Sequence, residues 1–267
     1  MSSTDNLKNN LFIYSVPLGS EASHLAEIYN SEKQNLIYIL PDNITITEFS
    51  SAIRFFDNKI KIVNLYEWDC QAYDSYGPSR ENQAKRILSL IKLKSYLKNK
   101  NKFITLVTPN TFLQKIQDLT IYNRLKINNN SHMDYNKLIT YLHVNGYEKV
   151  DSVYEVGTYA NRGGIIDVYS PNYKFPLRID FFGDKVDSLR LFNFQNQRTI
   201  KEIDESIIYP FSEIIFESQI ISNFQKNYIF NFKRDSNNEI YSNTIEKIRS
   251  NGRSTTIFTG ECRMHGI

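Results

Sequence analysis

Short apolar runs alternate with amphipathic stretches along the first 116 residues. The runs are rich in Ile, Val, Tyr or Phe and span Leu11–Tyr14, Asn35–Leu40, Ile60–Leu65 and Phe103–Val107. Runs of this length and composition, bounded by turn residues, are typical of strands. The sequence therefore predicts four short, largely buried strands in this part of the chain.

Helical patterns separate the four runs. The predicted helices cover Glu21–Tyr29, a stretch from the Thr45-x-x-Glu48 capping box to about Phe56, Ser79–Lys98, and Asn110–Ile116. In the longest of them, Ala84, Ile87 and Ile91 recur at the spacing of one helix face. Strands that alternate regularly with helices predict an α/β unit, in which a parallel sheet is flanked by helices.

A different pattern begins after residue 117. One helix is predicted over Asp134–Asn145, with Gly146 just past its end. From 147 to 194 only strand signals occur, and Leu177–Phe182 and Lys185–Leu191 flank a two-residue hairpin turn at Gly183-Asp184. We therefore expect an α/β first domain, formed by 1–117 and 210–267, with an inserted α+β domain at 118–209 that contains an antiparallel sheet. The structure of 214–267 is not predicted.

Charge and cysteine content limit the class of protein. The 267 residues carry 32 Lys+Arg and 29 Asp+Glu, a net charge of +3, which argues against a nucleic-acid coat or a polybasic membrane binder. The two cysteines, Cys70 and Cys262, lie too far apart in sequence to suggest a disulfide scaffold and fit a reducing compartment. No apolar run reaches the roughly 18–20 residues of a membrane span. These features predict a cytoplasmic protein that does not enter a membrane.

The turn before the first predicted helix stands where a phosphate loop would lie. A working loop needs glycines whose backbone N–H groups surround the phosphates, a Lys, and a Ser or Thr for the metal. Here the segment reads Gly19-Ser20-Glu21-Ala22-Ser23, with Glu21 at a glycine position and Ala22 at the lysine position. Because an acidic side chain repels phosphate, we expect this loop to be degenerate and inactive.

The Gly183-Asp184 hairpin gathers carboxylates. Pairing through its two-residue turn would set Asp180 opposite Asp187, and Asp167 lies on a neighbouring predicted strand. Facing carboxylates are unfavourable unless a metal or cations intervene. One hypothesis is therefore a metal-dependent nuclease; the favoured alternative is that nearby cations neutralise the acids, namely Arg178, Lys185 and Arg190.

The same hairpin presents a mixed outer side. Alternation places Leu177, Ile179 and Phe181 on a core face, which leaves Arg178 and Phe182 together on the opposite face. An exposed Phe beside an Arg has the composition of a protein-interface hot spot. The alternative is that a neighbouring loop or domain covers Phe182, and the sequence leaves both open.

Two long, ordered motifs carry a resemblance to a known family. They are Gly157-Thr158-Tyr159-Ala160-Asn161-Arg162-Gly163-Gly164-Ile165-Ile166-Asp167-Val168-Tyr169 and Pro176-Leu177-Arg178-Ile179-Asp180-Phe181-Phe182-Gly183-Asp184-Lys185-Val186-Asp187-Ser188-Leu189-Arg190, followed by Gln197-Arg198-Thr199. Together they resemble the second domain of the UvrB-homology module at the N-terminus of bacterial transcription-repair coupling factors, the Mfd family. The similarity covers roughly 8–215 and is strongest over 155–213. The degenerate phosphate loop and the short segment 66–87 favour this family over UvrB itself.

The resemblance implies a function in transcription-coupled nucleotide excision repair. In this family the second domain recruits UvrA, the damage-recognition ATPase, to stalled RNA polymerase, and the family's UvrA-contacting positions fall on Arg162, Arg178 and Phe182. A cluster of two arginines and an aromatic suits an acidic partner.

The resemblance also implies what this chain would lack. The complete family protein adds an RNA-polymerase-binding domain and a helicase-like, ATP-dependent DNA translocase, but no G-x-x-x-x-G-K-[ST] motif occurs here. We therefore expect no catalytic residue and no cofactor in this chain, with ATP and Mg²⁺ confined to the family's motor, and indirect contact with RNA polymerase and DNA through further domains. The sequence does not predict whether this chain has a DNA affinity of its own. The alternatives are a metal-dependent nuclease, a residual ATP-binding repair enzyme, or a non-functional remnant of a split gene.

Overall fold

The computed structural model describes residues 16–70 and 77–213 of the chain, so the predicted strand Leu11–Tyr14 and the tail after 213 lie outside the described residues. The α-helices are α1 (Leu18–Ser31), α2 (Asn43–Phe56), α3 (Arg80–Lys98), α4 (Pro109–Leu113) and α5 (Tyr135–Val144), with a 3₁₀ helix η2 (Leu119–Ile121). The strands are β1 (Leu36–Ile39), β2 (Ile62–Leu65), β3 (Ile104–Val107), β4 (Leu125–Asn128), β5 (Glu148–Lys149), β6 (Thr158–Arg162), β7 (Ile165–Val168), β8 (Leu177–Phe182), β9 (Lys185–Phe192), β10 (Thr199–Glu202) and β11 (Glu205–Ile208).

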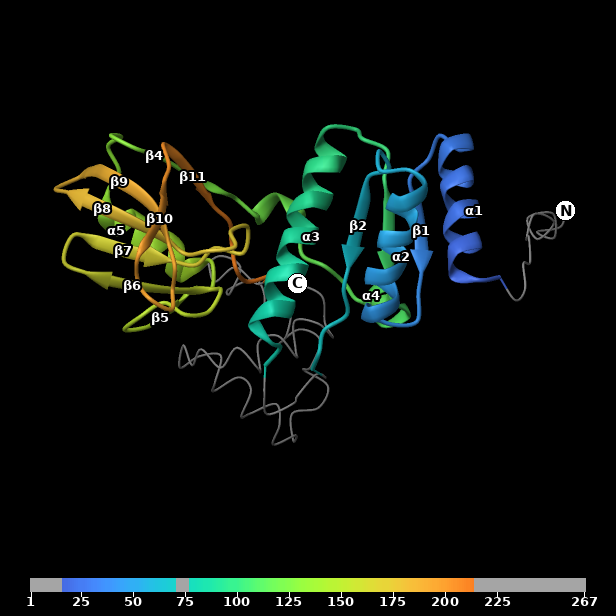
Figure 1. Ribbon diagram of the computed structural model, residues 1–267, viewed down its shortest axis with the longest axis horizontal. Helices are drawn as coiled ribbons and strands as arrows, with labels where there is room; N and C mark the ends of the chain where they lie inside the picture. The colour runs from blue at the N-terminus through green and yellow to red at the C-terminus, as the bar shows by residue number, and fades with distance from the viewer. Residues whose placement is uncertain (1–15, 71–76, 214–267) are drawn as a thin grey trace, which may run out of the picture.

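The first unit is a parallel sheet of order β1-β3-β2 between helices, shown on the right of Figure 1. Helices α1 and α2 supply Ala22, Leu25, Phe49 and Ile53 to the core on one side of the sheet. On the other side, α3 packs against β2 and β3. The predicted α/β class, with strands at three of the four apolar runs, is confirmed.

Two helix N-caps differ from the predicted ones. The N-cap of α2 is Asp42, whose carboxylate accepts the Thr45 N–H at 2.7 Å, so the expected capping box at Thr45 is wrong. Likewise Thr108, not Asn110, caps α4 through the Thr111 N–H. In both cases a capping side chain two or three residues before the expected start satisfies the free N–H groups first. The predicted start of α3 at Ser79 is confirmed.

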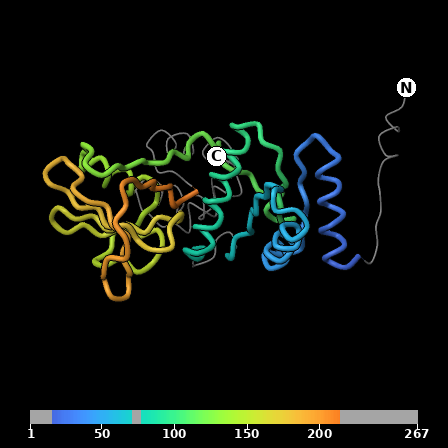
Figure 2. The backbone as a smooth tube through the Cα atoms, turned by 45° about the horizontal axis from the view of Figure 1, so that its top comes forward, coloured from blue at the N-terminus to red at the C-terminus, as the bar shows by residue number. Residues whose placement is uncertain are grey.

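The second unit is a six-stranded sheet of order β10-β9-β8-β7-β6-β5, antiparallel except for the parallel pair of β5 with β6. Its inner face packs on α5 through Leu138 and Leu142 from the helix and Ile166, Ile179 and Leu189 from the strands. The predicted helix and the hairpin turn at Gly183-Asp184 are both present. Strands β4 and β11 form a separate antiparallel pair where the chain enters and leaves this unit, as Figure 2 lets the reader follow.

Helix α3 lies between the two units and contributes to both cores. Ala84 packs with the second unit, whereas Ile87 and Leu90 pack with the first. Near its start, the Arg80 guanidinium forms ion pairs with Glu148 and Glu155 of the second unit. Among the described residues, no helix combines the length and the apolar character needed to cross a bilayer.

Candidate functional site

The expected phosphate loop is not a loop. Gly19, Ser20, Glu21, Ala22 and Ser23 all lie inside α1, which begins at Leu18. Ala22, at the position of the phosphate-binding lysine, is fully buried in the core of the first unit. The Glu21 carboxylate accepts a hydrogen bond from the Tyr38 hydroxyl. This bond holds the hydroxyl near the start of α1. The segment presents neither a glycine-rich cradle nor a cation to a phosphate.

The expected pairing of Asp180 with Asp187 is wrong. Asp180 faces Ser188, while Phe181 faces Val186 and Phe182 faces Lys185 as predicted. The register shift leaves Asp187 as the extra residue of a β-bulge on β9, where two residues oppose one. The Asp180 carboxylate instead accepts hydrogen bonds from the Ser188 hydroxyl and the Arg190 guanidinium. Within 16–70 and 77–213, no group of three acidic, His or Cys side chains is placed to hold a metal ion.

The side of the sheet that points away from α5 is called the outer face here. Its members are Arg162, Ile165, Asp167, Arg178, Asp180, Phe182, Ser188 and Arg190. Side chains of paired residues on neighbouring strands stand on the same face about 5 Å apart, so these residues form adjoining rows across the sheet. All three residues expected to contact a partner protein belong to this face.

Arg178 is fixed rather than free on the outer face. Its Nε and Nη2 donate to the two carboxylate oxygens of Asp167 at 2.7 and 2.8 Å, and Nη2 also donates to Gln197 Oε1 at 3.1 Å. The guanidinium lies 4.4 Å from the centre of the Phe192 ring. Asp167 is buried and the Arg178 side chain is 19% exposed. Hydrogen bonding to Asp167 raises the pKa of Arg178, so the guanidinium stays charged.

Phe182 is exposed at the tip of the hairpin, with 81% of its surface accessible. Its backbone is nevertheless braced. The preceding Phe181 N–H donates to the Gly164 carbonyl at 2.7 Å, and the Phe181 ring meets Tyr135 of α5 edge to face at 5.4 Å. Of the two alternatives that the sequence left open, the structure has an uncovered Phe182 among the described residues.

Arg162 lies at the end of β6, two strands away from Phe182. The Gly163-Gly164 turn that follows it approaches β8 so closely that a Cβ on Gly164 would lie 2.8 Å from the Phe181 carbonyl oxygen. The exposed Arg162 guanidinium donates to the Asp151 carbonyl and the Ser152 hydroxyl, both at 2.5 Å. The glycines thus bring Arg162 and Phe182 to the same end of the sheet.

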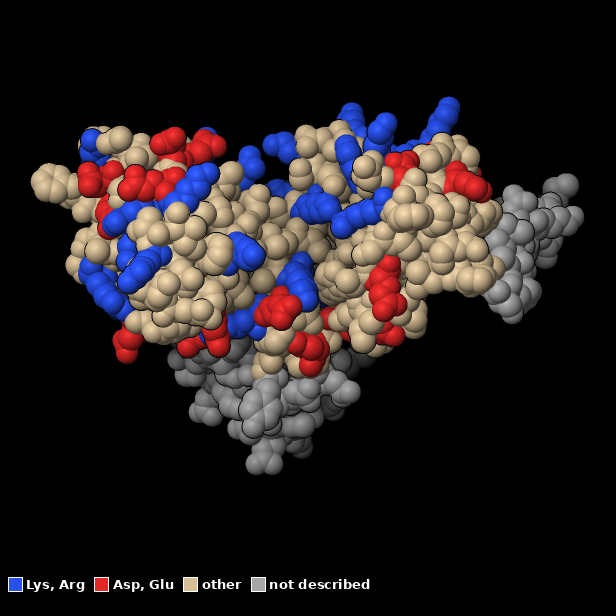
Figure 3. Space-filling view, viewed as in Figure 1, with Lys and Arg blue, Asp and Glu red and all other residues tan. Residues whose placement is uncertain are grey.

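Sequence reasoning singled out Arg162, Arg178 and Phe182 but missed the side chains that hold them. Phe192 beneath Arg178 and Gln197 beside it were not singled out, and Asp167 was considered as a metal ligand. Alternation along β9 from Arg190 to Phe192 could have placed the ring on the outer face. Acidic and basic side chains are interspersed over this unit in Figure 3. The outer face thus combines an exposed aromatic ring with two guanidinium groups that are held by hydrogen bonds.

Comparison with known proteins agrees with this architecture. The family model described as the UvrB interaction domain matches residues 125–214, which begin at β4 and include the whole six-stranded sheet.

Curated relatives extend the match to the first unit. Proteins named transcription-repair-coupling factor are 28% identical over 218 residues in Escherichia coli strain K12 and 26% identical over 212 residues in Haemophilus influenzae. The one from Rickettsia prowazekii is 30% identical over 184 residues. These matches cover 80%, 79% and 67% of this chain but only 19%, 18% and 16% of the relatives, so the chain spans less than a fifth of their length. The similarities support the resemblance drawn from the sequence, that of an N-terminal UvrB-homology module of the Mfd type.

Proposed function

Taking the chain as a UvrB-homology module of the transcription-repair-coupling type, we propose that it acts in transcription-coupled nucleotide excision repair by binding UvrA through its outer face. Arg162, Arg178 and Phe182 would make the contact. The observation that carries the proposal is the exposed Phe182 on a braced hairpin tip, on the same face as two oriented guanidinium groups.

The physical properties of this face suit a protein partner. A rigid aromatic ring and a prealigned guanidinium lose little conformational freedom on binding, which is why Phe, Tyr, Trp and Arg contribute strongly at interfaces. The outward guanidinium groups would select carboxylates on the partner and set its orientation. UvrA would thus meet a surface that needs no rearrangement.

We also propose that this chain binds UvrA without catalysing a reaction and without a nucleotide. Support comes from Ala22, buried where a phosphate loop has its lysine, and from the acids of the hairpin, which pair with Arg178 and Arg190. In the family, ATP, Mg²⁺, DNA translocation and RNA polymerase contact would belong to further domains.

The test compares two equally exposed phenylalanines. Phe182 and Phe55 are 81% and 84% exposed, but Phe55 lies on α2 in the other unit. We expect Phe182→Ala to weaken UvrA binding by about 2 kcal/mol or more, roughly 30-fold, as measured by biolayer interferometry, because hot-spot aromatics lose that much on truncation. Phe55→Ala is expected to leave the affinity unchanged.

Arg162→Ala provides a second measurement on the same face, and we expect a weaker but measurable loss. Equal affinity of the wild type and Phe182→Ala, or an equal loss in Phe55→Ala, would overturn the assignment of the outer face. Calorimetric titration with Mg²⁺ and ATP tests the absence of a nucleotide site, and heat of binding would contradict it.

A further inference from the structure

The small net charge of the chain conceals a strongly basic segment. Between residues 77 and 117 the sequence has nine Lys and Arg but a single acidic residue, Glu81, although the whole chain carries only +3. Most of these residues belong to α3 and the loop that follows it. A local field of one sign acts on a polyanion even where the total charge is near zero.

Part of this segment meets two other elements at the β2 edge of the parallel sheet. The residues Arg54, Lys59, Lys61, Lys92 and Tyr96 are called the β2-edge patch here. Arg54 ends α2, Lys59 and Lys61 lead into β2, and Lys92 and Tyr96 are one turn apart on α3. The ammonium groups of Lys61 and Lys92 each lie 5.6 Å from the centre of the Tyr96 ring. In Figure 3, basic side chains gather over the upper ends of α3 and β2 and the neighbouring end of α2.

These cations lack the carboxylate partners that other basic residues have. Arg80, Arg86, Arg178 and Arg190 each form an ion pair, whereas among the described residues no salt bridge includes Arg54, Lys59, Lys61 or Lys92. The nearby Asp57 carboxylate accepts a hydrogen bond from the Lys59 backbone N–H at 2.9 Å, and among the described residues it forms no salt bridge. Burial, and then the charge of Arg54, lower the pKa of Lys92, as expected where like charges crowd together without compensation.

Exposed aromatic rings follow one of these cations, Arg54, along the end of α2. Phe55 follows Arg54 directly, is 84% exposed, and meets Phe56 edge to face at 5.3 Å. Phe56 is itself exposed, and Tyr96 is partly so. Unpaired cations that flank exposed rings are the composition of surfaces that bind single-stranded nucleic acid, because the cations contact phosphates and bases stack on the rings.

We propose that the β2-edge patch, with Phe55 and Phe56 beside it, binds single-stranded nucleic acid through the phosphodiester backbone and base stacking. The patch shares no residue with the outer face, so this proposal does not depend on UvrA binding. Four cations that each neutralise one phosphate give a slope of log affinity against log salt of about −3 for a single strand.

The proposal is tested by fluorescence anisotropy of the full chain with a labelled oligo-dT strand. The strand is about 16 nucleotides long, because that length matches one binding face. We expect binding at low salt, with the slope given above. The triple variant Arg54→Ala/Lys61→Ala/Lys92→Ala should bind at least tenfold more weakly and show a flatter salt dependence. Phe55→Ala should lower the affinity at least fivefold, the smallest loss expected for one stacked base.

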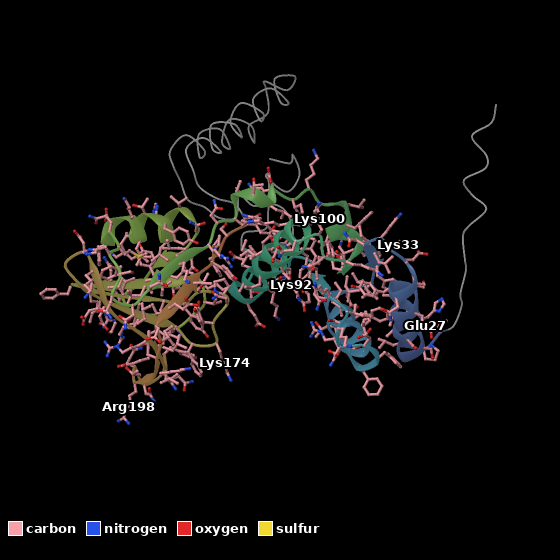
Figure 4. All side chains as sticks on the ribbon, turned by 90° about the horizontal axis from the view of Figure 1, so that it is seen from above. Glu27, Lys33, Lys92, Lys100, Lys174 and Arg198 are labelled. Atoms are coloured by element: carbon pink, nitrogen blue, oxygen red, sulfur yellow. The ribbon has the colours of Figure 1, made fainter. Side chains whose placement is uncertain are left out.

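A matched triple variant controls for the loss of positive charge. Lys174, Arg198 and Lys201 are exposed in the second unit, and Figure 4 shows Lys174 and Arg198 well away from Lys92. Lys174→Ala/Arg198→Ala/Lys201→Ala should leave binding unchanged. Since Lys61 and Lys92 are partly buried, the exposed Lys59→Glu serves as a variant that does not disturb packing, and it should weaken binding at least threefold.

Several results would overturn the proposal. They are no anisotropy change at low salt, equal losses in the two triple variants, unchanged binding by Lys59→Glu, or tighter binding of a duplex of the same sequence than of the single strand.

Discussion

Arg178 holds Asp167 through two hydrogen bonds, so it cannot leave the outer face without leaving a buried carboxylate behind. A residue expected to touch a partner is therefore also part of what holds β7 against β8. Any variant of Arg178 changes the stability of the sheet as well as its surface, and the two effects must be measured separately.

The first prediction separates them with a variant pair. Arg178→Met should lower the free energy of unfolding by about 3–5 kcal/mol, because it leaves Asp167 buried and unpaired. The double variant Asp167→Leu/Arg178→Met should lose less than Arg178→Met alone, since no charge is left buried. Urea unfolding followed by circular dichroism measures both. If the double variant lost as much unfolding free energy as the sum of the two single variants, Asp167→Leu and Arg178→Met, the ion pair would not be the source of the cost.

The second prediction concerns Gly157. Its φ is +80°, and a Cβ there would lie 2.3 Å from the Phe211 ring, which is buried and cannot move aside. Gly183 has a similar φ of +60° but open space around it. Gly183→Ala should lower the unfolding free energy by about 1 kcal/mol, because only the backbone conformation is unfavourable. Gly157→Ala should lower it clearly more, because steric overlap with the ring adds to the backbone strain. Similar thermal midpoints for the two variants would contradict this.

The third prediction concerns the contact between α3 and the chain beyond β11. Arg86 is 1% exposed, pairs with Glu213, donates to the Tyr66 carbonyl and lies 4.3 Å from the centre of the Trp68 ring. Arg86→Leu should destabilise the chain by about 3–5 kcal/mol, because Glu213 and the Tyr66 carbonyl lose their partner.

Glu213→Gln is the milder comparison, since the amide keeps one acceptor for Arg86 but no counter-charge for the buried guanidinium. We expect it to cost about 3 kcal/mol, the low end of the range for a broken buried ion pair, because one hydrogen bond is kept. Trp68 is the single tryptophan of the chain, so its fluorescence reports on unfolding of this region. Equal costs for Arg86→Leu and Glu213→Gln would contradict the central role of Arg86.

The fourth prediction is a loss of stability in alkali. Burial raises the pKa of Tyr122, Tyr141 and Tyr147, and the charge of Glu213 raises the pKa of Tyr122 further. The folded state thus keeps protons that the unfolded chain releases near the ordinary tyrosine pKa of about 10. Stability from these groups is complete below that pH and falls as the pH rises above it.

Urea midpoints between about pH 9 and 11 measure this effect, because that range brackets the ordinary tyrosine pKa. Tyr147→Phe should make the decline less steep, at the cost of the hydrogen bond that its hydroxyl donates to the Tyr209 carbonyl at 2.6 Å. The exposed Tyr154 provides a control, and Tyr154→Phe should leave the pH profile unchanged. Midpoints that do not change over this range would contradict the prediction.

Local patterns predicted the element types because apolar periodicity reflects which face is buried. Three of the four apolar runs are strands, and Gly183-Asp184 forms the hairpin turn. The apolar faces of α3 and α5 pack against the cores. Two helix starts were misplaced because Asp42 and Thr108 cap three and two residues earlier than the residues that pattern alone suggested.

Alternation assigned residues of the candidate site to one face of the sheet, but it gave no information on their contacts. Alternation placed Arg178 and Phe182 on one face, yet it could not reveal the bulge at Asp187. There the backbones of Asn130 and Ser131, which are distant in sequence, hydrogen-bond to Val186 on the side of β9 that faces away from β8. Nor could whole-chain charge reveal the β2-edge patch, because a sum over 267 residues hides which cations the fold brings together.

The pairing of β4 with β11 has a consequence for how the second unit can be exchanged. Leu125 and Ile208 are register partners, so the entering and leaving strands stand side by side, about 5 Å apart. The ends of the segment between them therefore lie close enough to be joined to another chain across one short gap. A graft of this segment would also have to replace Ala84 and Arg80 of α3, which contact the second unit.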